Sequence, residues 1–106
     1  MNKKFILILV TCANKKEALF IKEHLLKKRV VACVNIISNV SSFYWWQGKI
    51  DSGKEVLLML KSEQKLLKNI IKIVKQNHSY KVPEVIALPI IGGNSDYLKW
   101  ISESIK

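Results

Sequence analysis

Four stretches of the chain are almost continuously apolar and rich in aliphatic side chains, a composition that favours strands over helices. They are residues 4–11, 30–37, 56–60 and 82–91. A strand with one wetted face alternates polar and apolar positions, and these runs do not, so we expect both of their faces to be buried. Pro83 and Pro89 cannot donate to a sheet, which favours an edge position for the last run.

Two amphipathic stretches predict helices between these strands. Residues 15–28 follow Asn14, a favourable N-cap, and place Ala18, Ile21 and Leu25 on one stripe. A second helix is expected to open at Ser62, as its cap, and to end near residue 77. Its apolar positions repeat at helical spacing and are Leu67, Ile70, Ile71 and Val74. A last helix is expected to start at Ser95–Asp96.

Residues 30–50 predict a long second strand that bends at Ser38–Asn39 and ends in the aromatic run 43–46. The composition of Asp51-Ser52-Gly53 is typical of a turn. We therefore expect residues 41–50 and 54–61 to form an extended hairpin around it.

The predicted order is β-α-β-β-α-β followed by a terminal helix. This order predicts an α+β fold of the ferredoxin-like, double βαβ kind, as a single domain over residues 1–106 with two helices on one face of the sheet. The second face of the sheet is also predicted to be apolar, and a bare apolar face of that size is a liability in a monomer. We therefore expect a homo-oligomer in which Tyr44, Trp45 and Trp46 lie at the subunit interface.

Composition and charge narrow the function classes. The formal net charge is +10, but Arg29 is the only arginine among 18 basic residues. Readers of phosphates and bases use arginine forks, so we attribute the charge to solvated lysines and do not expect a nucleic-acid partner. No apolar run is long enough to span a membrane, and no membrane partner is expected. The chain start is interpreted as a strand and not as a signal peptide, which predicts a cytoplasmic protein with two reduced cysteines.

The sequence carries no recognisable catalytic motif. It has no GxSxG, phosphate-binding loop, HExxH or CxxC pattern, and its two histidines and eight acidic residues are scattered. A non-enzymatic protein is therefore expected.

Several blocks together resemble the CutA family of divalent-cation tolerance proteins. They are Val-Ala-Cys-Val-Asn-Ile-Ile at 31–37, Tyr-Trp-Trp-Gln-Gly-Lys-Ile at 44–50, Val-Pro-Glu-Val-Ile-Ala-Leu-Pro-Ile at 82–90 and Gly-Asn-Ser-Asp-Tyr-Leu-Lys-Trp-Ile at 93–101. The resemblance spans nearly the whole chain in order. It implies a ferredoxin-like protomer, a trimer, and a link to copper tolerance with binding of copper or another divalent cation in some members.

The resemblance also implies metal ligands, which this chain matches only in part. The copper ligands proposed in some members are a cysteine at the end of the first strand and a histidine pair before Pro-Tyr. Here Val10 takes the cysteine position and Cys12 lies two residues further on. The pair is reduced to Asn77–His78, and Ser79 replaces the proline. Cys12 and His78 are thus the candidate metal residues, and the alternative for His78 is an ordinary loop histidine.

Other polar residues suggest a second kind of site. Lys61, Tyr80, Glu84 and Asn94 are candidates to line clefts between subunits, where small anions or metals could dock. For Glu84 the alternative is an ion pair with Lys61 across a subunit boundary. Two alternative functions stay open: a small-ligand-binding regulatory trimer, and an RNA-recognition-motif-like module that stacks bases on its sheet.

Overall fold

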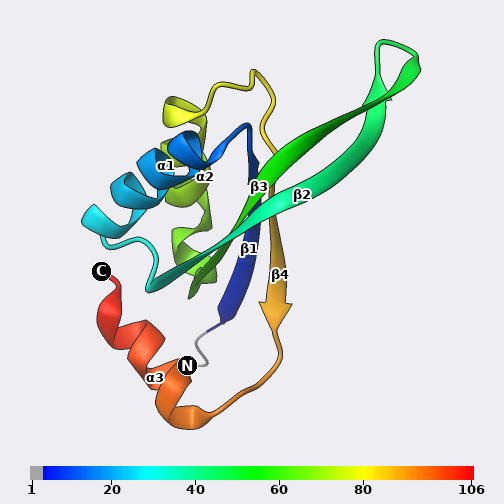
Figure 1. Cartoon of the computed structure of the whole chain (residues 1–106). Coiled ribbons are helices and arrows are strands. Elements are labelled where there is room, and N and C mark those ends of the chain that lie inside the picture. Colours follow the sequence, from blue (N-terminus) through cyan, green and yellow to red (C-terminus); the bar gives the residue numbers. More distant parts are fainter. Residues whose placement is uncertain (1–3) are drawn as a thin grey trace.

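One antiparallel sheet organises the chain in the computed structural model, which describes residues 4–106 (Figure 1). Residues 1–3, which the predicted domain includes, lie outside the described residues. The strand order is β2-β3-β1-β4. The elements are β1 (Phe5–Cys12), α1 (Lys15–Lys27), β2 (Cys33–Trp46), β3 (Lys49–Glu63), a 3₁₀ turn η1 (Gln64–Leu66), α2 (Leu67–Asn77), β4 (Val85–Ile90) and α3 (Ser95–Ser104). This is a small single-domain α+β fold, as the sequence predicts.

The core lies between the sheet and the layer formed by α1 and α2. Alternate residues of β1 point into it, and Ile8 and Val10 are fully buried. They meet Leu58 and Leu60 of β3 and the predicted stripe of α1, centred on Ile21. α1 and α2 pack on this face of the sheet because doing so buries their apolar stripes.

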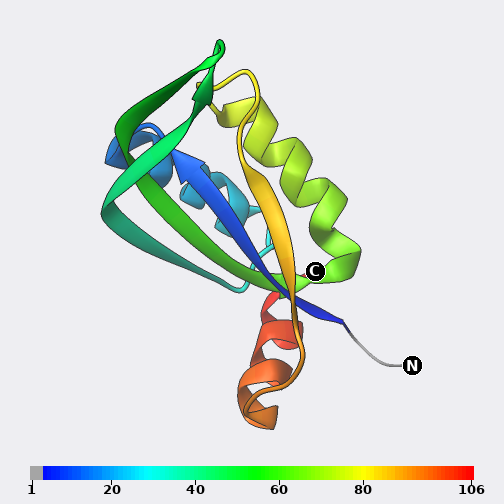
Figure 2. The ribbon, with the colours of Figure 1, turned by 90° about the vertical axis from the view of Figure 1, so that its right-hand side faces the viewer.

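On the opposite face of the sheet, none of the helices formed by residues 4–106 covers the strands. Figure 2 looks onto this face, with the strands in front of α1 and α2. The strand registers place a patch of large apolar side chains on it, here called the open face. The patch comprises Phe5, Leu7 and Leu9 from β1, Leu57 and Met59 from β3, Ile37 from β2, and Ile86 and Leu88 from β4. The second apolar face that the sequence predicts is therefore present. Ile86 and Leu88 on it are 50% and 43% exposed within the protomer, so its burial by another subunit stays a prediction.

The hairpin of β2 and β3 is longer than predicted, and its turn is elsewhere. Residues 51–53 lie inside β3, where Ser52 pairs with Phe43. The turn is formed by Gln47 and Gly48, whose φ angles of 50° and 78° suit the tight two-residue hairpin connection. The prediction was wrong because the turn-like composition of 51–53 is overridden by pairing with the aromatic strand opposite. The predicted bend at Ser38–Asn39 is confirmed as a register shift, with Asn39 at φ 62°.

Three element boundaries also differ from the prediction. Ser62 does not cap a helix, because β3 continues to Glu63 and the buried Ser62 hydroxyl donates to the Val30 carbonyl oxygen (2.6 Å). Val30 and Val31 are buried but precede β2, which starts at Cys33. α2 starts at Leu67, and its buried stripe runs through Ile70, Ile73 and Val74, so that Ile71 lies at the half-buried edge of the stripe.

The turn gives a first testable prediction. Gln47 holds a left-handed backbone conformation that asparagine tolerates better, so Gln47→Asn should stabilise the protein by about 0.5 kcal/mol. Urea unfolding at fixed protein concentration measures this change. The matched control is Gln76→Asn within α2, where asparagine is the poorer helix former and should give no gain. An equal gain at both positions would contradict the explanation.

Candidate functional site

Three side chains that are distant in sequence meet at one end of the helix layer, here called the clasp. They are Cys12 at the end of β1, Glu17 in the first turn of α1, and His78 directly after α2. One ligand atom from each, a sulfur, a carboxylate oxygen and an imidazole nitrogen, lies within 4.8 Å of the other two. Among residues 4–106 no other histidine, cysteine or acidic residues gather in this way.

His78 is the buried centre of the clasp. Its side chain has no exposed surface. Its Nε2 lies 2.7 Å from the Thr11 carbonyl oxygen, and the Tyr80 N–H donates to its Nδ1 (3.0 Å). These partners assign a neutral ring that donates through Nε2 and accepts through Nδ1. The ring thereby ties β1 to the chain after α2, which is the role of a structural histidine, the alternative to a metal ligand that the sequence left open.

Glu17 closes the clasp from the helix side. Its carboxylate accepts from the Ala13 N–H (3.0 Å) and the Ser79 N–H (2.8 Å) and lies 3.6 Å from Nδ1 of His78. Burial by itself raises the pKa of Glu17, but the Ala13 and Ser79 donors outweigh it and hold the pKa below its usual value. The Asn14 side chain accepts from the Glu17 N–H (2.8 Å), so the two residues form a capping arrangement.

Sequence reasoning missed Glu17, although a signal was present. Asn14 followed three residues later by glutamate is the spacing of a capping box. That pattern predicts a carboxylate folded back to the N–H of the N-cap residue, and in the structure it accepts one residue earlier, from the Ala13 N–H. Its second contact, to Ser79, joins segments 62 positions apart and has no local signature.

Cys12 is fully buried and belongs to the core as much as to the clasp. Burial, followed by the nearby Glu17 and Glu55 carboxylates, raises the pKa of its thiol to about 12. The group is therefore a neutral thiol at physiological pH, not a thiolate.

The residue types of the clasp fit a divalent ion. To bind one, the clasp would have to give up hydrogen bonds that its side chains make within the protein. Sulfur, imidazole and carboxylate donors suit copper and zinc. Each donor is engaged within the protein: both His78 nitrogens contact backbone groups, and Cys12 retains its proton. An ion would have to displace the Tyr80 N–H from Nδ1 and the proton from the thiol, so binding would be pH-dependent.

The predicted cleft residues are not brought together within one protomer. Lys61 lies on the open face, where its Nζ donates to Asn35 Oδ1 (2.6 Å). Tyr80 lies near the clasp and donates to Glu55 Oε2 (2.8 Å), and its pKa is raised by burial and by this carboxylate. Glu55 and Lys61 are separated by about 20 Å along β3. Glu84 is exposed before β4, and Asn94 caps α3 by accepting from the Asp96 N–H (2.9 Å).

The predicted interface aromatics lie at the far end of the hairpin. Tyr44, Trp45 and Trp46 flank its turn and are 43%, 73% and 61% exposed. Figure 1 shows this tip projecting away from the helices. Trp45 and Trp46 thus expose most of their surface within the described protomer, whereas the Tyr44 hydroxyl lies beside Gly53 of β3.

The Glu17 carboxylate gives a second prediction. A carboxyl group whose pKa is depressed in the folded state stabilises it above the unfolded-state pKa, and this stabilisation is lost as the pH falls through the folded value. Stability should therefore decline on the acid side of the usual glutamate pKa. Glu17→Gln should lower stability at neutral pH and flatten that decline, as followed by urea unfolding across pH. Glu23→Gln, on the same helix, should leave the profile unchanged.

Comparison with known proteins finds relatives for the chain as a whole. Residues 6–104 match the family model described as CutA1 divalent ion tolerance protein. Over 101 residues the chain is 43% identical to Protein CutA 1, chloroplastic, of Oryza sativa subsp. japonica, covering 95% of this chain and 57% of that protein. The chain thus spans little more than half the length of that relative.

A bacterial relative matches over nearly its whole length. The chain is 38% identical over 97 residues to the divalent-cation tolerance protein CutA of Thermus thermophilus, covering 92% of this chain and 94% of that protein. The crystal structure of CutA1 from Oryza sativa superposes with a TM-score of 0.95 at 42% identity, covering 97% and 94% of the two chains.

Proposed function

Because the chain belongs to the CutA1 divalent ion tolerance protein family, we propose that it acts in divalent-cation tolerance as a homotrimer and not as an enzyme. The proposal treats residues 1–106 as one ferredoxin-like domain, for which the strand order and the helices on one face are support. It also keeps a cytoplasmic location. Among the described residues, no helix combines the length and the apolarity that a membrane crossing requires.

The open face is the observation that carries the proposed assembly. It exposes large apolar side chains such as Ile86 and Leu88, and within residues 4–106 no helix or strand lies over it. At about 25 cal/mol per Å², covering such a face supplies a large driving force before the cost of association. The exposed aromatics at the hairpin tip, Trp45 and Trp46, supply a second contact of the kind that subunit interfaces enrich.

We assign the cation to the clasp. Copper or another divalent ion would be held by Cys12, Glu17 and His78, whose ligand atoms already lie within 4.8 Å of one another. Bound there, the ion would supply a cross-link between β1, α1 and the segment after α2. Since the thiol must lose its proton, affinity should fall as the pH is lowered.

Metal titration and a mass measurement test the two parts separately. Protein purified without an affinity tag should take up Cu²⁺ or Zn²⁺ in calorimetry, and Cys12→Ser should weaken that uptake. His24→Ala, which removes the other histidine, should leave the uptake intact. Native mass spectrometry should give three 12.2-kDa protomers. No uptake would contradict the metal assignment alone, whereas a stable monomer would contradict the assembly.

Lys61 favours the second candidate, a regulatory trimer that binds a small anion. It is a cation on an otherwise largely apolar face, and its contacts are the neutral Asn35 and Cys33. A covering subunit would leave it buried without a counter-charge, which is costly unless an anion accompanies it. That anion would be Glu84 of another subunit or a small ligand.

Replacing Lys61 indicates whether an anion is present. If a carboxylate or ligand faces it, Lys61→Met should weaken the assembly by about 2 kcal/mol per subunit, because the anion is left unpaired. Sedimentation at decreasing protein concentration measures this. A tighter assembly in the variant would mean that no anion meets Lys61. The RNA-recognition-like alternative has no support, because the aromatic run lies at the hairpin tip and not at the centre of the sheet.

A further inference from the structure

The positive charge of the chain is concentrated on one layer of the fold. The helix layer, defined as residues 15–29 and 64–77, holds ten of the 18 basic residues and two of the eight acidic ones. Its net charge is therefore +8, and the rest of the chain contributes only +2 to the total of +10. Of the two acids, Glu17 is turned into the clasp. The expectation of solvated lysines on the helix surfaces therefore describes where the charge lies, but it does not account for the small number of acidic residues among them.

The outer side of α2 is a continuous cationic strip. Its lysines follow at helical spacing and include Lys68, Lys72 and Lys75. Among residues 4–106 no acidic side chain forms an ion pair with these three, whereas Lys65 lies 3.8 Å from Glu63. Like charges three and four residues apart repel one another, so an external anionic surface would relieve this repulsion.

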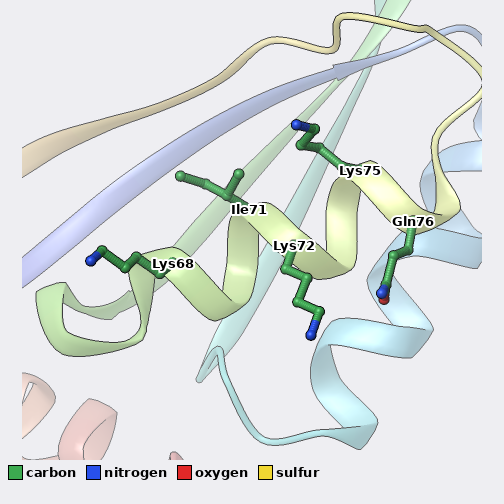
Figure 3. Close-up of a pocket in the computed structure, with 5 residues that line it drawn as sticks. All are labelled: Lys68, Ile71, Lys72, Lys75 and Gln76. Atoms are coloured by element: carbon green, nitrogen blue, oxygen red, sulfur yellow. The ribbon is translucent and has the colours of Figure 1, made fainter.

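The strip surrounds a shallow hollow of about 380 Å³ lined by Lys68, Ile71, Lys72, Lys75 and Gln76. Figure 3 shows Lys68 and Lys75 on either side of Ile71, while Lys72 and Gln76 extend on the opposite side of the helix, toward α1. The ammonium groups spread apart and do not converge on one point. This arrangement suits an extended anionic surface better than a single small anion.

The neighbouring helix adds exposed apolar side chains to the same layer. On α1, Leu19, Phe20 and Leu26 are 43%, 49% and 39% exposed. They alternate with Lys16, Lys22 and Lys27 along the helix. A nucleic-acid backbone offers such aliphatic groups no apolar partner, whereas a bilayer interface accepts leucine and phenylalanine below its headgroups. Lysine in place of arginine also suits headgroup attraction more than base readout.

We propose that the helix layer docks on anionic phospholipid membranes, with the lysines of both helices on the headgroups and the apolar side chains of α1 at the acyl boundary. The attachment is peripheral and revises the expectation that no membrane partner exists. It is independent of the clasp and compatible with the proposed trimer, because the helix layer and the open face lie on opposite sides of the sheet (Figure 1).

Vesicle co-sedimentation tests the proposal on the full chain. Vesicles of phosphatidylcholine with about 30% phosphatidylserine should bind the protein, and pure phosphatidylcholine vesicles should not. Lys68→Gln/Lys72→Gln/Lys75→Gln should lower the affinity by about 100-fold. The matched control, Lys49→Gln/Lys81→Gln/Lys99→Gln, removes the same charge outside the helix layer and should change the affinity by less than about threefold. Circular dichroism checks the fold of both variants.

A second measurement distinguishes insertion of the α1 side chains into the bilayer from electrostatic attraction to the headgroups alone. Phe20→Trp, in a chain whose three native tryptophans are changed to phenylalanine, should shift its emission to the blue when anionic vesicles are added. If that chain does not fold, Phe20→Ser in the native background should weaken vesicle binding while retaining its salt dependence. Equal losses in the two lysine triples, no vesicle binding, or tighter binding to oligonucleotides than to vesicles would each overturn the proposal.

Discussion

Ile86→Glu should convert the protein into a folded protomer that no longer assembles. Ile86 is 50% exposed on β4 and pairs with Leu9 on the open face, so a glutamate there can be solvated in an isolated protomer. When another subunit covers the face, the same carboxylate is buried among aliphatic groups, which costs several kcal/mol for each subunit. The dissociation constant should rise by at least about 1,000-fold, and native mass spectrometry should show mainly the 12.2-kDa species.

The control for this variant is a glutamate of similar exposure on the other side of the sheet. Leu26 on α1 is 39% exposed, and Leu26→Glu should leave the assembly intact. Both variants should retain the circular dichroism spectrum of the native protein. An Ile86→Glu protein that keeps the native mass would show that the open face is covered in some other way, and the proposed trimer would then lose its main support.

His78→Ala should be among the most destabilising single substitutions outside the hydrophobic core, even with no metal present. The buried ring contacts the Thr11 carbonyl oxygen and accepts from the Tyr80 N–H. Its removal leaves both backbone groups without these partners, frees Glu17 from its neighbour and opens a cavity. Together these losses should lower the free energy of unfolding by about 3 kcal/mol.

Urea unfolding at fixed protein concentration, in the presence of a chelator, measures this loss, since assembly makes stability concentration-dependent. His24→Ala is the matched control. His24 lies on the exposed side of α1, where its ring contacts Phe20, and its loss should cost no more than about 0.5 kcal/mol. A similar small effect at His78 would contradict the structural role of the clasp. For this reason metal uptake is better probed by changing Cys12 than by removing His78.

The fold follows from the sequence wherever a pattern repeats. The stripe of α1 and its Asn14 cap, the order of elements and the two-sided apolar sheet are all readable from spacing. The position of the hairpin turn could not be predicted from the sequence. Gln47–Gly48 is a weaker turn signal than Asp51–Gly53, and only cross-strand pairing decides between them. The prediction that Ser62 caps a helix was wrong for a similar reason, because its hydroxyl donates to a carbonyl oxygen 32 positions away and not to a local helix start.

The candidate site was predictable only in part for the same reason. His78 and Cys12 were both identified through a resemblance, Cys12 as the cysteine two residues beyond the expected ligand position. Their meeting with Glu17 depends on how α1 and the end of α2 come together over β1, which no local pattern encodes. The placement of lysines on the outer sides of two helices that share one face of the sheet was predictable from helical spacing, whereas the exposure of Leu19 and Phe20 beside them depends on how α1 packs.

The placement of the two cysteines gives the molecule a pair of intrinsic chemical reporters. Cys12 is sealed in the core and holds its proton tightly, so a thiol-reactive dye should label it only when the whole domain unfolds. Cys33 lies half-buried at the start of β2, beside Lys61, where a covering subunit would shield it from reagent. In a single native sample, the labelling rate of Cys12 would therefore report global unfolding. The labelling rate of Cys33 would report dissociation of the subunits.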